Sequence, residues 1–289
     1  MEALNRDVPG VDGLTLNLVD HGGDGPPLLF AHGFGHGAHL FDALVPALRE
    51  HFHVLALDNR GHGDSPDDPE FRYHSAAISR DLENVVIHLG HDDVTLVGHS
   101  QGGHACIRFA GRHPERMARL VLAESGPEIV AASGDGPTDA VRLLAPSFAS
   151  RDAYADVLGE VYPQLDAAER ENLAAHFTRE CDDGSVEPKL DERFLTKQLK
   201  KSAEWRGKFD REAWAKKERG RLWHYLERVT CPTLVIHGEN SQMVSSATAQ
   251  RMVDEVLPRA RAVALAGAGH TLMLDRPREF REAVLEFLL

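Results

Sequence analysis

The sequence predicts an α/β fold: a mostly parallel sheet with helices on both faces and an inserted helical cap. Short apolar runs alternate with segments of helical periodicity, a rhythm typical of parallel sheets, in which a crossover helix follows each strand. This rhythm stops at residue 128, where charged residues become dense, and resumes at residue 229. We therefore assign residues 1–127 and 229–289 to the sheet domain and residues 128–228 to the cap.

The sheet elements before the cap follow from the spacing of apolar residues. Alternation predicts a partly buried strand over residues 11–19, and continuous apolar runs predict covered strands. The covered strands are expected over residues 27–31, 52–57, 93–97 and 120–123. Apolar residues at helical spacing predict helices over residues 40–48, 75–89 and 101–112.

The remaining elements follow from the same patterns. Within the cap, helices are expected over residues 167–178 and 192–201. After the cap, strands are expected over residues 232–237 and 260–265, and helices over residues 247–257 and 277–289.

Composition limits the possible partners. A net charge of -13 argues against a nucleic-acid or anionic-membrane surface, so we expect neither partner. The three cysteines are widely spaced, and this predicts neither a disulfide framework nor a zinc site. The first residues show no basic segment followed by an apolar run, and no stretch reaches the ~18 apolar residues of a membrane span. We expect a cytoplasmic protein, whose oligomeric state the sequence leaves open.

A candidate nucleophile lies between a predicted strand and a predicted helix. Residues 98–102 read Gly-His-Ser-Gln-Gly, the G-x-S-x-G pattern of a nucleophile elbow. Gly98 and Gly102 suit a sharp turn in which a Cβ atom would collide with the neighbouring strand or helix. The pattern predicts that Ser100 is held at the N-terminus of a helix, where negative charge is favoured.

Other residues can supply the partners of such a serine. His270 follows a predicted strand within a loop of small residues, so its ring is free to reach across the strand ends as a general base. Two backbone N–H groups are expected to bind the oxyanion: that of Gln101, after the nucleophile, and that of Phe34, between two glycines.

Together these motifs resemble the α/β-hydrolase fold superfamily. The matching segments are residues 32–35 (His-Gly-Phe-Gly), 58–65, 98–102 and 269–270, in the order and spacing of that family. The resemblance implies a hydrolase with a serine, a histidine and an acid, covered by a helical cap. We expect it to need no cofactor and no metal.

The acid departs from the commoner pattern of the family. Many members carry an aspartate after the penultimate strand, but Ser241 stands at that position and cannot hold a negative charge. Some members carry the acid after the strand that follows the elbow helix, and here that residue is Glu124. We favour Glu124 over Glu239, and we expect a Ser241→Ala substitution to have little effect.

Several loop residues near the expected site could bind a metal ion. They are His32, His36, His39, Asp58 and His62. A metal site needs three or four converging ligands, and nothing in the sequence shows such convergence. We expect these side chains to form hydrogen bonds within the loops, and Asp58 to anchor its loop.

The leading hypothesis is a serine hydrolase that cleaves an ester, lactone or related acyl bond of a small, largely apolar molecule. In this hypothesis His270 takes the proton of Ser100, which attacks the carbonyl carbon, and water then hydrolyses the acyl-enzyme. Two alternatives remain open: a carbon-carbon bond hydrolase with the same triad, and a non-catalytic protein that binds a small ligand.

Overall fold

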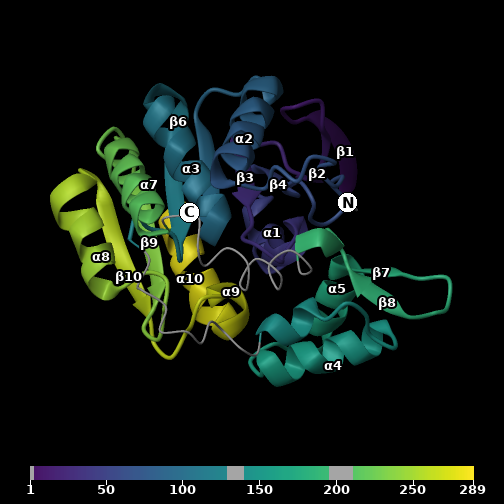
Figure 1. Ribbon diagram of the computed structural model, residues 1–289. Helices are drawn as coiled ribbons and strands as arrows, with labels where there is room; N and C mark the ends of the chain where they lie inside the picture. The colour runs from purple at the N-terminus through teal and green to yellow at the C-terminus, as the bar shows by residue number, and fades with distance from the viewer. Residues whose placement is uncertain (1–2, 129–139, 195–210) are drawn as a thin grey trace.

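The computed structural model describes residues 3–128, 140–194 and 211–289. In these ranges eight strands form one sheet in the order β1-β2-β4-β3-β5-β6-β9-β10 (Figure 1). β1 (Leu4–Pro9) pairs antiparallel with β2 (Thr15–Gly22), which pairs antiparallel with β4. All other neighbours are parallel: β3 (Pro27–Ala31), β4 (His53–Leu57), β5 (Val94–His99), β6 (Met117–Ala123), β9 (Thr233–Gly238) and β10 (Ala260–Leu265). The mostly parallel sheet is confirmed.

Helices cover both faces of this sheet. One face packs against η1 (Ala38–Leu44), α1 (Val45–Leu48), α9 (Leu272–Asp275) and α10 (Pro277–Leu288). The other packs against α2 (Ser75–Leu89), α3 (Ser100–Arg112), α7 (Arg211–Leu226) and α8 (Ser246–Arg251). No helix in the described ranges combines the length and apolar character needed to cross a membrane.

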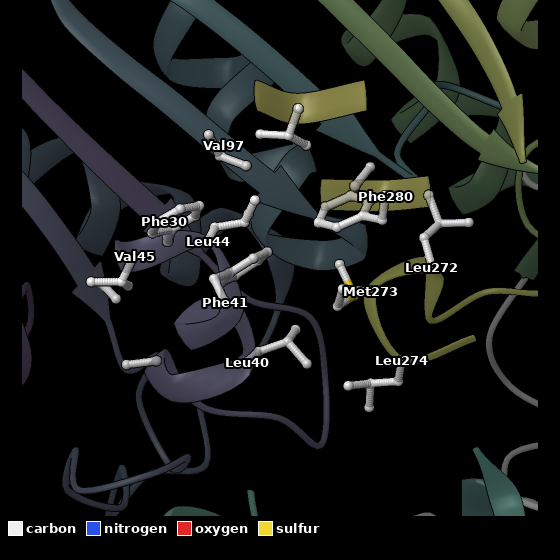
Figure 2. Close-up of a cluster of buried hydrophobic side chains, with 14 of the residues drawn as sticks. Phe30, Leu40, Phe41, Leu44, Val45, Val97, Leu272, Met273, Leu274 and Phe280 are labelled. Carbon is white, nitrogen blue, oxygen red and sulfur yellow. The ribbon is translucent and has the colours of Figure 1, made fainter. Parts of the chain in front are cut away.

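Alternating strand residues divide the core between these two faces. Leu29 joins the cluster beneath α2 and α3, whereas its neighbour Phe30 joins the cluster beneath η1 and α10. Figure 2 shows the second cluster, in which Phe30 stacks on Phe41 with ring centroids 4.6 Å apart. Phe280 of α10, the last helix of the chain, packs into the same cluster.

Several elements differ from the sequence-based expectation. β1 was not expected, because as an edge strand it buries only Val8 and so lacks an apolar alternation. β2 begins at Thr15 rather than at residue 11. The helix expected over residues 40–48 is a 3-10 helix followed by one α-helical turn, and the helix expected over 247–257 ends in a π-helix, η5 (Met252–Val256).

The described part of the cap contains strands as well as helices. It comprises η3 (Ala140–Leu144), α4 (Arg151–Val161), α5 (Ala167–Phe177) and a hairpin of β7 (Thr178–Glu180) and β8 (Val186–Pro188). These elements lie together at the lower right of Figure 1, and α5 packs against η1. Three-residue strands are too short to show a periodicity, so the sequence did not indicate the hairpin. Most of the helix expected over residues 192–201 lies outside the described residues.

Helix α7 packs with the sheet domain although the sequence placed it in the cap. It contacts α3, and its residues Leu222 and Leu226 belong to the core cluster of that face. We therefore propose that the cap ends before α7. Helix α7 has few apolar and many charged residues, so its composition resembles that of the cap.

A buried arginine anchors the 58–65 loop to α2. Arg60 is fully buried and donates hydrogen bonds to Asp81 at 2.6 and 2.8 Å and to Asp68 at 2.8 Å. An Arg60→Met substitution is expected to lower the free energy of unfolding by ~3–5 kcal/mol, because two carboxylates lose their buried cation. Urea denaturation followed by circular dichroism measures this change. The half-exposed Arg80→Met is the control, and equal effects of the two substitutions would contradict the assignment.

Candidate active site

The turn around Ser100 is as tight as the sequence predicts. Ser100 is the first residue of α3, directly after β5, and its φ of 51° lies in the left-handed region. A Cβ atom on Gly98 would lie 2.5 Å from the Cα atom of Gly103, and one on Gly102 would lie 2.2 Å from the carbonyl oxygen of Ala31. Only glycine fits either position, so strand and helix hold the serine in this strained conformation.

The structure brings Ser100, His270 and Glu124 together at the carboxyl ends of three strands. His270 Nε2 lies 3.0 Å from Ser100 Oγ, and His270 Nδ1 lies 3.3 Å from Glu124 Oε2. The Glu124 side chain is fully buried, and His270 is 22% exposed. These are the contacts that a nucleophile, a general base and an orienting acid require.

The carboxylate of Glu124 is fixed by further donors. The N–H of Gly238 donates to Oε1 at 2.7 Å, and the hydroxyl of Ser241 donates to Oε2 at 2.5 Å. The competing acid Glu239 instead accepts a hydrogen bond from the N–H of Gly267 at 3.2 Å, on the surface. The geometry therefore favours Glu124 as the partner of His270.

Ser241 has a role that the sequence analysis missed. Besides contacting Glu124, its oxygen accepts hydrogen bonds from the N–H groups of Met243 and Val244, both at 3.0 Å. These two bonds orient the hydroxyl hydrogen toward the carboxylate. The sequence does contain a signal for this role. Ser241, a small hydrogen-bond donor, stands where many members of the family carry the acid, one strand away from the buried Glu124.

Ser241→Ala is now expected to reduce activity, in contrast to the sequence-based expectation. A hydrogen bond to a charged group is worth ~1.5–3 kcal/mol, so we expect kcat to fall by about 10-fold or more while KM changes little. Ser241→Thr retains the hydroxyl and should recover activity. Ser245→Ala is the matched control, because that hydroxyl caps α8 on the same loop. Unchanged kcat in a folded Ser241→Ala variant would refute this positioning role.

The loop after β3 comes close enough to Ser100 to supply an oxyanion donor. A Cβ atom on Gly33 would lie 3.0 Å from the Cβ atom of Ser100, so glycine permits this approach. The next residue, Phe34, lines the same cavity as Ser100. Gln101 is the second residue of α3, where N–H groups have no acceptor within the helix. Both positions suit the proposed oxyanion hole.

His99 supports the loop that carries His270. It is fully buried, and its Nε2 lies 2.9 Å from the backbone carbonyl oxygen of His270. A carbonyl can only accept, so Nε2 carries the hydrogen. Burial lowers the pKa of His99 well below its usual value, which keeps the ring neutral. The variable position of the G-x-S-x-G pattern gave no sign of this contact.

Asp58 and His32 form the hydrogen bonds that the sequence predicts for them. Asp58 accepts from the N–H groups of Ala38 at 2.6 Å and Asp64 at 3.0 Å, and burial raises its pKa. His32 Nε2 accepts from the N–H of Asn59 at 3.0 Å. These contacts join two loops beside the site.

Two cavities meet at the nucleophile. The first has a volume of about 300 Å³ and lies between the loop after β3, η3, α4 and the loop before α9. It is lined by Phe34, Gly35, His36, Ser100, Leu143, Leu144, Tyr154, Leu158, Tyr162, Phe177, Met243, His270, Thr271 and Leu274. The second, of about 230 Å³, lies between α3 and α7. It is lined by Ser75, Ser100, Gln101, His104, Pro127, Ala215, Glu218, Arg219, Leu222 and Met243.

Comparison with known proteins identifies the family. Residues 26–277 match the family described as alpha/beta hydrolase fold. The chain is 27% identical to a 2-(acetamidomethylene)succinate hydrolase of Mesorhizobium japonicum over 95% of its length and 92% of the relative. It is also 27% identical to a mouse (Mus musculus) sn-1-specific diacylglycerol lipase, ABHD11, over 95% of its length and 85% of the relative.

A solved structure supports the same assignment. The crystal structure of an alpha/beta hydrolase from Novosphingobium aromaticivorans superimposes with a TM-score of 0.78 and 26% identity, covering 99% of this chain and 98% of that one. The residues that match the family include both Ser100 and His270. The chain therefore belongs to the alpha/beta hydrolase fold family and is an α/β-hydrolase enzyme.

Proposed function

We propose that the protein hydrolyses an ester or lactone of a small molecule through a Ser100-His270-Glu124 triad. The observation that carries this proposal is the position of His270, whose two ring nitrogens contact Ser100 Oγ and Glu124 Oε2. A histidine in this bridging position can take the serine proton with one nitrogen while the acid stabilises the resulting imidazolium through the other.

The reaction follows in two steps. His270 removes the Ser100 proton as Oγ attacks the substrate carbonyl, and the N–H groups of Phe34 and Gln101 bind the oxyanion. His270 then gives the proton to the leaving alkoxide, which departs as an alcohol and leaves an acyl-enzyme. Water, deprotonated by His270, then attacks the acyl-enzyme. As the acyl–Oγ bond breaks, His270 gives this proton to Ser100 Oγ and the carboxylic acid is released.

The two cavities indicate where the acyl group and the leaving group of a substrate would bind. The first is lined mainly by aliphatic and aromatic side chains, and among the described residues that line it there is no lysine or arginine. It suits an apolar acyl group, and about 300 Å³ is at the lower end for small-molecule sites. The second contains His104, Glu218 and Arg219 and suits a more polar leaving group.

The difference between the two cavities argues against assigning the substrate of the first relative to this protein. The Mesorhizobium japonicum relative is named for 2-(acetamidomethylene)succinate, a molecule with two carboxylates. The first cavity has no described lysine or arginine, so a carboxylate bound there would be buried unpaired, which is costly, and Arg219 of the second cavity could pair with only one of the two carboxylates. The diacylglycerol lipase is a closer guide, because its named substrate is an ester with apolar acyl chains.

The experiment that tests the proposal is hydrolysis of p-nitrophenyl esters with acyl chains of increasing length, alongside lactones and a vinylogous diketone. We expect esters of short to medium apolar acids to be cleaved at rates that Ser100→Ala abolishes. Cleavage of the diketone alone would favour the carbon-carbon bond hydrolase. Binding of these compounds without any turnover would favour the non-catalytic alternative.

Chain-length selectivity provides a prediction about the acyl cavity. Leu144 is partly exposed and lines this cavity, so Leu144→Phe adds volume there without overpacking the core. We expect kcat/KM for the longest accepted acyl chain to fall by at least ~10-fold relative to the acetyl ester. Leu4→Phe, at a position 56% exposed in β1, is the control. A uniform loss across all chain lengths would place the acyl group elsewhere.

A further inference from the structure

A second cluster of ligating side chains lies away from the triad, where the cap meets the sheet domain. His39 and Asp42 come from η1, and His176 comes from the cap helix α5. One potential ligand atom from each of the three lies within 4.8 Å of the other two. His39 Nδ1 and Asp42 Oδ2 are 2.9 Å apart, and the rings of His39 and His176 stack with centroids 3.5 Å apart.

A fourth side chain faces this cluster from β2. His21 is only 8% exposed, and its Nε2 lies 3.8 Å from Asp42 Oδ1. Both atoms are buried and neither has a hydrogen-bond partner within the described residues. Buried polar atoms without partners are uncommon and carry a free-energy cost. Here the two unpaired atoms lie 3.8 Å apart, a separation that a bound ion could bridge.

The surroundings are suited to an ion rather than to a closed packing contact. These four side chains line one cavity of about 390 Å³. Arg49 and Asp64, which carry opposite charges, line the same cavity. Asn172 of α5 donates to Asp42 Oδ2 at 2.9 Å and so orients the carboxylate. Support of a ligating carboxylate by a neighbouring donor is a usual feature of metal sites.

We propose that His21, His39, Asp42 and His176 form a binding site for a transition-metal dication such as Zn²⁺. Three imidazoles and one carboxylate form a ligand set that Zn²⁺ accepts in tetrahedral geometry. Ligands of tetrahedral zinc lie ~3.4 Å apart, given bonds of ~2.0–2.1 Å. His21 Nε2 and Asp42 Oδ1, at 3.8 Å, are already near this spacing, and pairs separated by as much as 4.8 Å close by about 1 Å. The stacked rings of His39 and His176 rotate about their Cβ–Cγ bonds to direct their lone pairs at the ion, and the cavity leaves room for this.

The site joins two parts of the chain that already contact each other, among other places through the hydrogen bond from Asn172 to Asp42. Three ligands belong to the sheet domain and one belongs to the cap, so a bound ion fixes α5 against η1. Phe177, the residue after His176, lines the proposed acyl cavity. The ion therefore restrains one wall of that cavity without taking part in the chemistry at Ser100. This inference does not depend on the proposed function.

Metal binding can be measured without any substrate. The metal-free protein is titrated with Zn²⁺ by calorimetry and with Co²⁺ by visible absorption, because tetrahedral Co²⁺ has a distinctive spectrum. We expect one ion per chain with a Kd in the micromolar range or tighter, a tetrahedral Co²⁺ spectrum, and a Tm that rises with Zn²⁺. His176→Ala should weaken binding by more than the ~10-fold seen when only an outer partner is lost.

Controls separate this site from other histidines. His224→Ala removes a ring that is 67% exposed on α7 and should bind Zn²⁺ as the wild type does. Asp42→Asn keeps the shape of the side chain and removes its charge, and it should lose affinity while its metal-free Tm stays close to that of the wild type. Absence of a tetrahedral Co²⁺ spectrum, or equal affinity in the wild type and His176→Ala, would overturn the proposal.

Discussion

Ser100→Ala is expected to lower kcat for p-nitrophenyl ester hydrolysis by at least ~10⁴-fold, because the substitution removes the atom that attacks the carbonyl. The strained φ of 51° at this residue is compatible with alanine, so the fold and the surrounding hydrogen bonds should be retained. KM should change little, because alanine differs from serine only by the missing hydroxyl and the rest of both cavity walls is retained. Steady-state kinetics and the Tm of the variant together test this expectation.

Covalent labelling identifies the nucleophile directly. Intact mass should show one fluorophosphonate adduct on the wild type and none on Ser100→Ala. Ser125→Ala is a suitable control, because that hydroxyl donates to the carbonyl oxygen of Ser100 at 2.9 Å but does not face His270. It should still be labelled. An adduct on folded Ser100→Ala would place the nucleophile on another residue.

Glu124→Ala is expected to lower kcat by at least ~10³-fold, because His270 then loses the charge that stabilises its imidazolium and fixes its tautomer. The effect should appear in kcat rather than in KM, since Glu124 is buried behind the histidine and lines neither cavity. Fluorophosphonate labelling of this variant should be correspondingly slow. Both rates are measured on protein whose folding has been checked by circular dichroism.

The competing acid supplies a matched control. Glu239→Ala removes an exposed carboxylate from the same region and should leave kcat within a few-fold of the wild type. Ser241→Asp in the Glu124→Ala background places a carboxylate at the position more common in the family, and we expect it to recover part of the lost activity. Near-normal kcat in Glu124→Ala would remove Glu124 from the triad and bring Glu239 forward.

The order of the strands explains why the acid of the triad can follow either β6 or β9. β5, β6 and β9 are neighbours in the sheet, and their carboxyl ends carry Ser100, Glu124 and Ser241 respectively. An acid after β6 therefore lies one strand away from an acid after β9. The hydroxyl of Ser241 donates to the Glu124 carboxylate, so both positions take part in fixing one charge beside His270.

The sequence alone predicted the sheet, which the structure confirms, and it proposed Ser100 as the nucleophile and His270 as its base. Covered parallel strands are apolar along their whole length, and this local signal survives without knowledge of any partner segment. The small residues around Ser100 and before His270 are required by the local backbone geometry, so the sequence alone indicates these two positions as well. The oxyanion positions at Phe34 and Gln101 followed from the same motifs and remain predictions.

The tertiary structure decided what depends on contacts between distant segments. It added the contact of Glu124 Oε2 with His270 Nδ1 at 3.3 Å, which supports the preference for Glu124 over Glu239 that the sequence had already indicated. It revealed the roles of Ser241 and His99, whose residue types carry no local signal. It also brought His176 of the cap beside His39 and Asp42. Periodicity and motifs report how each segment is buried, whereas these contacts depend on how loops and the cap pack across the strand ends.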